Sequence, residues 1–229
     1  VYADARREEK DGSRRSPVVF LGSIAEVPEP VDWTHDQFEL GAVYRFARGY
    51  ARLSWYLSSF DNALAGFSFE NAYLPLAPDT TFGRKAQAPD NDASLVALDG
   101  NVLLPWWDGV LSYRLADGRY RQDATFLPIS TSAALTGAAT LPRSNLDGEV
   151  DTAHYRASLS LRPPSRVRLR GSYRHDERDD KTDPFTVTYV ETDSYPGTTA
   201  TARRYGYERA SLDGSAEVRL LDWLHVAVG

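Results

Sequence analysis

The stretch LPRSNLDGEVDTAHYRASLSLRPPSRVRLRGSYRHDERDDKTDPF, residues 141–185, carries the clearest secondary-structure signal in this chain. From residue 151 onward, apolar and polar side chains alternate; the apolar positions are Ala153, Tyr155, Ala157, Leu159 and Leu161, and the polar ones are Thr152, His154, Arg156, Ser158 and Ser160. A repeat of two residues is typical of a β-strand whose two faces have different surroundings. The stretch is therefore predicted to begin with a two-faced strand.

A second strand with the same alternation follows Pro163, Pro164 and Ser165. Its apolar or small positions are Val167, Leu169, Gly171 and Tyr173, and its polar positions are Arg166, Arg168, Arg170, Ser172 and Arg174. Two consecutive prolines cannot continue a helix or a β-ladder, because proline has no N–H to donate. The two strands are therefore predicted to form a hairpin.

Three more hairpins are predicted from the same alternation. The first pairs residues 37–46 with 50–60, the second pairs 91–104 with 110–122, and the third joins 205–220 to a shorter strand that follows Leu221 and Asp222. Short turns thus centre near residues 48, 107, 164 and 221. Between them lie segments 61–90, 123–148 and 176–204, which are rich in Asn, Asp, Pro and Gly and are predicted to be long loops.

The N-terminal part gives a weaker signal. Residues 1–15 are highly charged, which favours a solvated loop, and residues 17–24 are predicted to form a short strand. Pro28 and Pro30 then indicate a turn. We expect residues 1–30 to be a loop and a partial strand.

Short turns and long loops alternate regularly along the chain, and this alternation indicates its architecture. Transmembrane β-barrels combine strands of about 9–11 residues with short periplasmic turns and long outer loops, whereas soluble sandwiches lack this asymmetry. We predict an all-β, antiparallel, up-and-down transmembrane β-barrel, with about eight strands visible in residues 1–229 as a single segment of a larger wall. Trp106, Trp107 and Trp223 lie beside short turns, either as an interfacial aromatic girdle or simply as apolar turn residues.

Composition excludes several kinds of chemistry. The chain of 229 residues has no cysteine, so it can form neither disulfides, thiolate metal sites nor the Cys-x-x-Cys-His attachment of a c-type haem. We therefore expect no cofactor bound by this chain itself. It has no initiator Met and no signal peptide, so we expect a piece of a longer, processed protein.

No catalytic or metal-binding motif is found. His35, His154, His175 and His225 have no ligand spacing, and no catalytic serine motif or phosphate-binding glycine loop is present. The acidic residues after the second strand, namely Asp176, Glu177, Asp179, Asp180 and Asp183, lack the calcium-loop pattern. They are expected to lie in a solvated outer loop.

The arginines of residues 156–174 are the main candidates for function. Arg166, Arg168, Arg170 and Arg174 share one face, and pairing of the two strands would add Arg156 and Arg162. An arginine facing lipid near the bilayer midplane costs about 2–4 kcal/mol, so this face is predicted to line the lumen. The arginines either form an internal salt-bridge ladder with Asp213 and Glu217 or contact a partner in the lumen.

Counting from the turn gives the expected register of this hairpin. It places Ser160 opposite Arg168, Ser158 opposite Arg170 and His154 opposite Arg174. The lumenal face of the hairpin would then carry several positive charges and no carboxylate.

Four long segments resemble a known family. They are WYLSSFDNALAGFSFENAYLP (55–75), APDNDASLVALDG (88–100), LPRSNLDGEVDT (141–152) and SLRPPSRVRLRGSYRHDERDDKT (160–182). In this order they resemble the MtrB/PioB family of decahaem-associated outer-membrane proteins, over most of residues 31–219. The resemblance implies a bacterial outer-membrane barrel, in contact with lipid, that houses a periplasmic multihaem c-type cytochrome, and it leaves room for an extracellular cytochrome as a second partner.

We therefore expect a structural protein of a porin–cytochrome conduit rather than an enzyme. The resemblance implies that haem is carried by the partner and that the barrel lets it transfer electrons across the outer membrane (extracellular electron transfer). The alternatives are a solute-conducting porin or receptor barrel without a cytochrome, and an outer-membrane enzyme, which the absence of a catalytic constellation disfavours. Nothing in the sequence indicates a nucleic-acid partner.

Overall fold

The computed structural model describes residues 1–20, 23–71, 82–128, 141–164, 166–188, 199–221 and 224–229. These residues form an all-β structure, as predicted, and none of them belongs to a helix long and apolar enough to cross a membrane. The strands are β1 (Tyr2–Phe20), β2 (Ser23–Phe46), β3 (Gly49–Asn62), β4 (Gly66–Glu70), β5 (Phe82–Ala86), β6 (Asn91–Leu103), β7 (Val110–Gln122), β8 (Gly148–Leu161), β9 (Val167–Asp180), β10 (Phe185–Thr188), β11 (Thr199–Ala202), β12 (Tyr207–Leu221) and β13 (Leu224–Val228).

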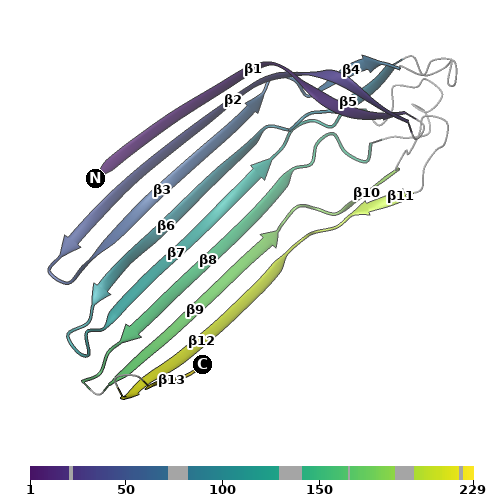
Figure 1. Ribbon diagram of the computed structural model, residues 1–229. Helices are drawn as coiled ribbons and strands as arrows, with labels where there is room; N and C mark the ends of the chain where they lie inside the picture. Colours follow the sequence, from purple (N-terminus) through teal and green to yellow (C-terminus); the bar gives the residue numbers. More distant parts are fainter. Residues whose placement is uncertain (21–22, 72–81, 129–140, 165, 189–198, 222–223) are drawn as a thin grey trace.

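Nine of these strands form one antiparallel sheet in the order β1-β2-β3-β6-β7-β8-β9-β12-β13 (Figure 1). Each strand of this sheet pairs with the sheet strands before and after it in the chain, which is up-and-down topology. The pairs β4·β5 and β10·β11 are small separate hairpins within the long connections. The four predicted hairpins are confirmed, and most of their strand ends differ by only a few residues from the prediction.

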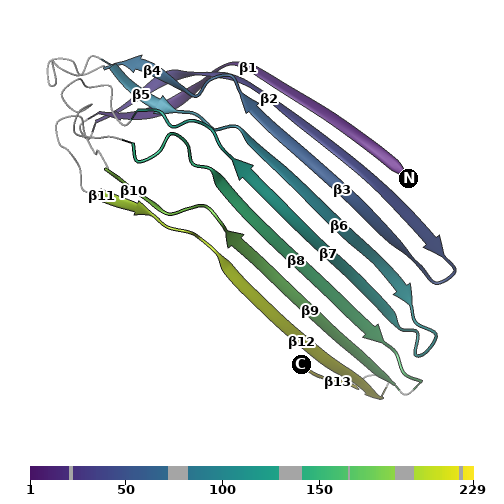
Figure 2. The same ribbon diagram turned by 180° about the vertical axis from the view of Figure 1, so that it is seen from behind.

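The two ends of the sheet differ as predicted. The ends of β2, β6, β8 and β12, which are followed by short turns, lie together at one end, and the long connections lie at the other, in both views (Figures 1 and 2). In the short β6–β7 turn, the Gly109 N–H donates to the Trp106 carbonyl at 3.2 Å. Trp107 and Asp108 between them have φ angles of 58° and 42°, so they form a type I′ turn, whose twist matches that of the flanking strands.

The expected loop and turn within residues 1–30 are wrong. β1 and β2 pair without interruption from Tyr2 opposite Gly41 to Phe20 opposite Ser23. Pro28 and Pro30 are tolerated because this part of β2 has β1 on one side only, so no ladder needs their missing N–H groups. The Pro30 carbonyl points away from β1 and accepts a hydrogen bond from the Gln87 side chain at 2.6 Å. The pair therefore projects beyond the end of β3 as a long ribbon (Figure 1).

The sheet is a single layer with very little core. In the described part of the chain, the buried hydrophobic residues are Val18, Val31, Phe67, Ala97 and Ala116. Large apolar side chains are instead exposed along the strands, with Leu53 at 52% and Leu212 at 81%. A soluble domain of this size would bury its large apolar residues between layers. This sheet needs an apolar environment on one side.

Candidate functional site

The strand register divides the sheet into two faces. Residues directly opposite each other in an antiparallel pair project from the same face. One row across five strands therefore consists of Ala42, Leu53, Leu98, Leu115 and Tyr155, and the next row consists of Tyr44, Ala51, Gly100, Tyr113, Ala157, Tyr173 and Leu212. These rows form a continuous apolar face.

The other face is polar and carries an excess of positive charge. From β6 to β12 its arginines are Arg114, Arg156, Arg168, Arg170, Arg174, Arg178, Arg209 and Arg219, and its carboxylates are Asp99, Asp176, Asp180, Asp213 and Glu217. So many charged groups cannot face lipid. The polar face is the one that faces away from the membrane.

The structure brings most of the predicted arginines together. Arg156, Arg168, Arg170 and Arg174 lie on the polar face of β8 and β9. Arg166 precedes β9 and lies in the turn, where its carbonyl accepts a hydrogen bond from the Arg219 N–H at 2.8 Å. Arg162 is also in this turn, and its N–H donates to the Trp107 carbonyl at 2.6 Å.

The predicted register of this hairpin is wrong by two residues. Ser160 lies opposite Arg170, Arg156 opposite Arg174, and His154 opposite Asp176. The reason is the turn, which spans residues 162–166 rather than 163–165; Ser165 itself lies outside the described residues. Because the error is an even number of residues, every side chain keeps its predicted face.

The polar face of the hairpin does contain a carboxylate, contrary to expectation. β9 continues to Asp180, so Asp176 belongs to the strand and not to a loop. Its side chain is 6% exposed, lies 3.0 Å from His154 Nδ1 and accepts a hydrogen bond from Arg174. Of the acidic residues after Asp176, Glu177 and Asp179 lie on the opposite face of β9 from Asp180, and Asp183 follows the strand. No group of three potential metal ligands occurs in the described part of the chain.

The salt-bridge ladder is only partly present. Arg168 contacts Glu217 at 3.4 Å, and Arg52 on β3 contacts Asp99 on β6 at 2.8 Å. Asp213 lies opposite Ser172 rather than opposite an arginine. Among the side chains that the structure describes, no hydrogen bond or ion pair is found for Arg114, Arg156 or Arg170.

A hollow of about 690 Å³ lies on the polar face around Arg114 and Arg156. Its floor is the row of Ala116, His154 and Asp176. It is lined further by Leu95, Arg114, Tyr120, Arg156, Arg174, Tyr205, Tyr207 and Arg209. Sequence reasoning missed Arg114 and Arg209, although the alternation of residues 110–122 places Arg114 between the apolar Tyr113 and Leu115.

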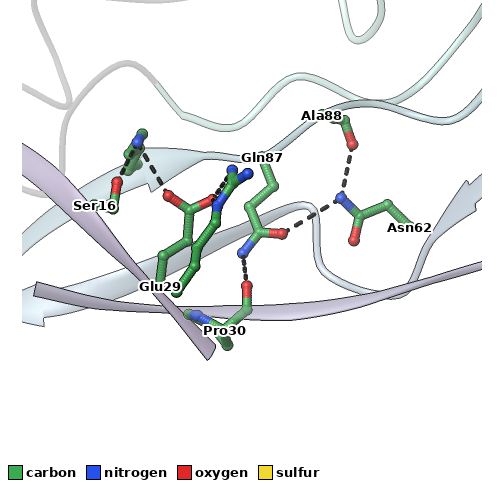
Figure 3. A network of polar contacts seen from close by, with 8 residues as sticks. Ser16, Glu29, Pro30, Asn62, Gln87 and Ala88 are labelled. Atoms are coloured by element: carbon green, nitrogen blue, oxygen red, sulfur yellow. Dashed lines mark hydrogen bonds and ion pairs between the residues drawn. The ribbon is translucent and has the colours of Figure 1, made fainter. Parts of the chain in front are cut away.

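A second polar cluster lies where the β1–β2 ribbon packs against the β4–β5 hairpin (Figure 3). Glu29, 2% exposed, binds Arg14 and lies 3.1 Å from Lys85 Nζ, which also donates to the Ser16 hydroxyl. The hydrogen bond from Ser16, with those from Arg14 and Lys85, lowers the pKa of Glu29 to about 2. Gln87 joins the ribbon to Asn62 of β3. These contacts fix the ribbon against the hairpin.

The exposed tryptophans of the short turn fit the girdle prediction in position. Trp106 and Trp107 are 53% and 47% exposed at the end of the apolar face. Trp223, predicted as a third member, lies outside the described residues. Of the histidines, His154 binds Asp176, whereas His175 lies on the apolar face and stacks on Tyr155 with ring centroids 5.6 Å apart.

One antiparallel layer with an apolar face, a polar face, short turns at one end and long connections at the other is the wall of a transmembrane β-barrel. The polar face lines the lumen, and the apolar face contacts lipid.

Comparison with known sequences agrees with this class. The model of the family described as "Putative outer membrane beta-barrel porin, MtrB/PioB" matches residues 1–229. The chain belongs to this family, is located in the outer membrane and is porin-like; the family is not one of enzymes. The chain is also 28% identical over 220 residues to "Outer membrane protein MtrB" of Shewanella baltica (strain OS185). The match covers 96% of this chain and 30% of that relative, so the chain spans less than a third of the relative's length.

Proposed function

We propose that this chain forms part of a porin-like sheath that houses a multihaem c-type cytochrome and lets it transfer electrons across the outer membrane. The haem belongs to the partner, since a chain without cysteine has no c-type attachment site. The barrel itself has a structural role: it holds the partner across the membrane and separates it from lipid.

The observation that supports this function best is the set of arginines without partners on the lumenal face. A wall that only enclosed water could balance its charges internally, as Arg52 and Asp99 do. Arg114, Arg156 and Arg170 instead present donors to the lumen. An inserted protein with an acidic surface would complete these contacts and would bind faster and more specifically because of the opposite charge.

Purification of the full-length protein from its native membrane tests the proposal. We expect the absorbance bands of c-type haem to coelute with the barrel after detergent extraction and gel filtration. A solute-conducting porin, the second candidate that a positively charged lumen favours, would elute without haem. It would also conduct small anions in planar bilayers as isolated. Absence of haem from every preparation would contradict the proposed function.

A further inference from the structure

The lumenal face has a row of like charges on three neighbouring strands. Arg114 on β7 lies directly opposite Arg156 on β8, which lies directly opposite Arg174 on β9. Like charges in directly opposed positions of an antiparallel pair weaken the pairing. The row therefore does not stabilise the sheet, and another role must explain it.

The carboxylates near this row are already engaged. Asp99 lies directly opposite Arg114, but it contacts Arg52 on its other side at 2.8 Å. Asp176 accepts from Arg174 and contacts His154. Within the described part of the chain, Arg114 and Arg156 are thus left with no carboxylate in contact.

The row of Arg114, Arg156 and Arg174 forms one wall of the hollow described above. The hollow is present because the residue at its floor is small. Ala116, 3% exposed, is a small residue between the arginine row and the next row, which contains Leu95, Gly118 and Tyr207. Arg114 and Arg156 on one side, and Leu95 and Tyr207 in the row of Gly118 on the other, have much longer side chains than Ala116, so a depression is left above it. Tyr120 and Tyr207 add phenol groups to the lining, and Arg209 adds a further cation.

We infer that this hollow binds carboxylate groups on the surface of the protein seated in the lumen, with Arg114 and Arg156 as the principal donors. The planar guanidinium group offers paired N–H donors that match the two oxygens of a carboxylate. The excess of arginines over carboxylates on this face provides the charge complementarity. The inference rests on the proposed function and names the part of the wall that contacts the partner.

The test uses the full-length protein with its copurifying haem protein. The test variant carries Arg114→Gln and Arg156→Gln. The matched control carries Arg45→Gln and Arg219→Gln, which removes the same charge from two arginines of the same face that do not line the hollow. Haem retained by the immobilised barrel is measured as the NaCl concentration rises.

We expect the test variant to bind the haem protein about tenfold more weakly than the parent, since lost charge-assisted contacts mainly increase dissociation. The control should release it close to the parental salt concentration. The folded test variant should unfold at a temperature at least as high as the parent, as judged by heat-modifiable gel mobility. The reason is that the substitutions remove the repulsion between the opposed Arg114 and Arg156 side chains. A purely structural role for these arginines predicts the opposite: lower stability with retention unchanged.

Equal release from the test variant and the control would overturn the inference and leave the proposed function intact, because general lumenal charge would then suffice. A parent without haem would overturn the proposed function first. A small-anion site is distinguished with the partner-free barrel in planar bilayers, using hexaglutamate and inorganic phosphate as blockers. The inference predicts that hexaglutamate blocks the current more strongly than phosphate does, and that the hexaglutamate block is weaker in the test variant but not in the control. Stronger block by phosphate would contradict the inference.

Discussion

At the scale of single residues, the alternation of the strands assigns each side chain to lipid or to lumen. Leu53 lies in the middle of the apolar part of β3, Leu159 lies near the short-turn end of β8, and Ser158 is the lumenal neighbour of Leu159. An arginine on the lipid face costs about 2–4 kcal/mol at the midplane and about 0–1 kcal/mol near the interface. Leu53→Arg should therefore impair insertion most, Leu159→Arg less and Ser158→Arg least.

The measurement is the fraction of folded barrel, by heat-modifiable mobility, after refolding of each full-length variant into lipid vesicles at increasing urea concentration. If Ser158→Arg lowered the folded fraction more than Leu53→Arg, the assignment of the two faces would be reversed. The sequence predicts this assignment well, because the period of two needs no knowledge of the partner strand. It does not predict the hollow, whose members come from several strands and meet only through the register.

At the scale of elements, the hairpins were predictable and the N-terminal ribbon was not. Each hairpin has its own apolar alternation and its own turn residues, so local sequence suffices. β1 lacks an apolar face, and it is stabilised by contacts that depend on pairing, such as the hydrogen bond of Arg7 Nε to Asp36 Oδ1 at 2.7 Å. The turn at residues 162–166 shows a further limit: Pro163 and Pro164 mark the turn, but they do not determine its length.

The contact between the ribbon and the β4–β5 hairpin should depend on pH through Glu29. Its pKa is lowered from 4.5 to about 2, so the carboxylate contributes stability that is fully present above about pH 4.5. This stability is lost as the pH falls through about 2. Hydrogen exchange in β4 and β5, corrected for intrinsic rates, should therefore show equal protection at pH 7 and pH 5 and less protection at pH 3.

Glu29→Gln should reduce this protection by about 2 kcal/mol at pH 7, because hydrogen bonds to a charged acceptor are lost. It should also remove most of the difference between pH 5 and pH 3. Glu26→Gln is the matched control, since Glu26 is an exposed carboxylate on the same strand. A Glu26→Gln protein with the same loss of protection would show that Glu29 has no special role.

At the scale of the whole molecule, the borders of the apolar face show how the membrane crosses the sheet. Toward the long connections, the first charged residue on the apolar face is Asp36 on β2 and Glu208 on β12. Glu208 lies on the same row of the sheet as Leu40, which is four residues from Asp36. From β2 to β12, this border of the apolar face therefore shifts by four residues toward the short turns. The lower border moves the same way. Phe46 is the last residue of β2, whereas the apolar face of β12 continues through Val218, four residues beyond Gly214, which lies on the row of Phe46.

A shift of this size corresponds to a tilt of roughly 25° between the strands and the membrane normal, taking about 3.3 Å per residue and about 4.8 Å between strands. Barrel strands must tilt to close, typically by 35–45°, and an oblique apolar band is what such a tilt produces. Neither border can be derived from the sequence without the register, because each strand alone shows only where its own apolar part ends. The oblique band, with long connections above it and short turns below it, sets the orientation of the protein in the membrane.

This orientation predicts which residues are reachable from outside the cell. Long loops of such barrels are extracellular and short turns are periplasmic. Single cysteines at the exposed positions Ala88, Ser144 and Thr201 should react with a membrane-impermeant maleimide on intact cells, and residues 1–229 contain no native cysteine. A cysteine at Asp108, in the β6–β7 turn, should react only after the outer membrane is permeabilised. The orientation also places the Glu29 contacts between the β1–β2 ribbon and the β4–β5 hairpin outside the cell, because they lie at the end of the long connections (Figure 1). Equal labelling of Asp108→Cys on intact cells would contradict both assignments.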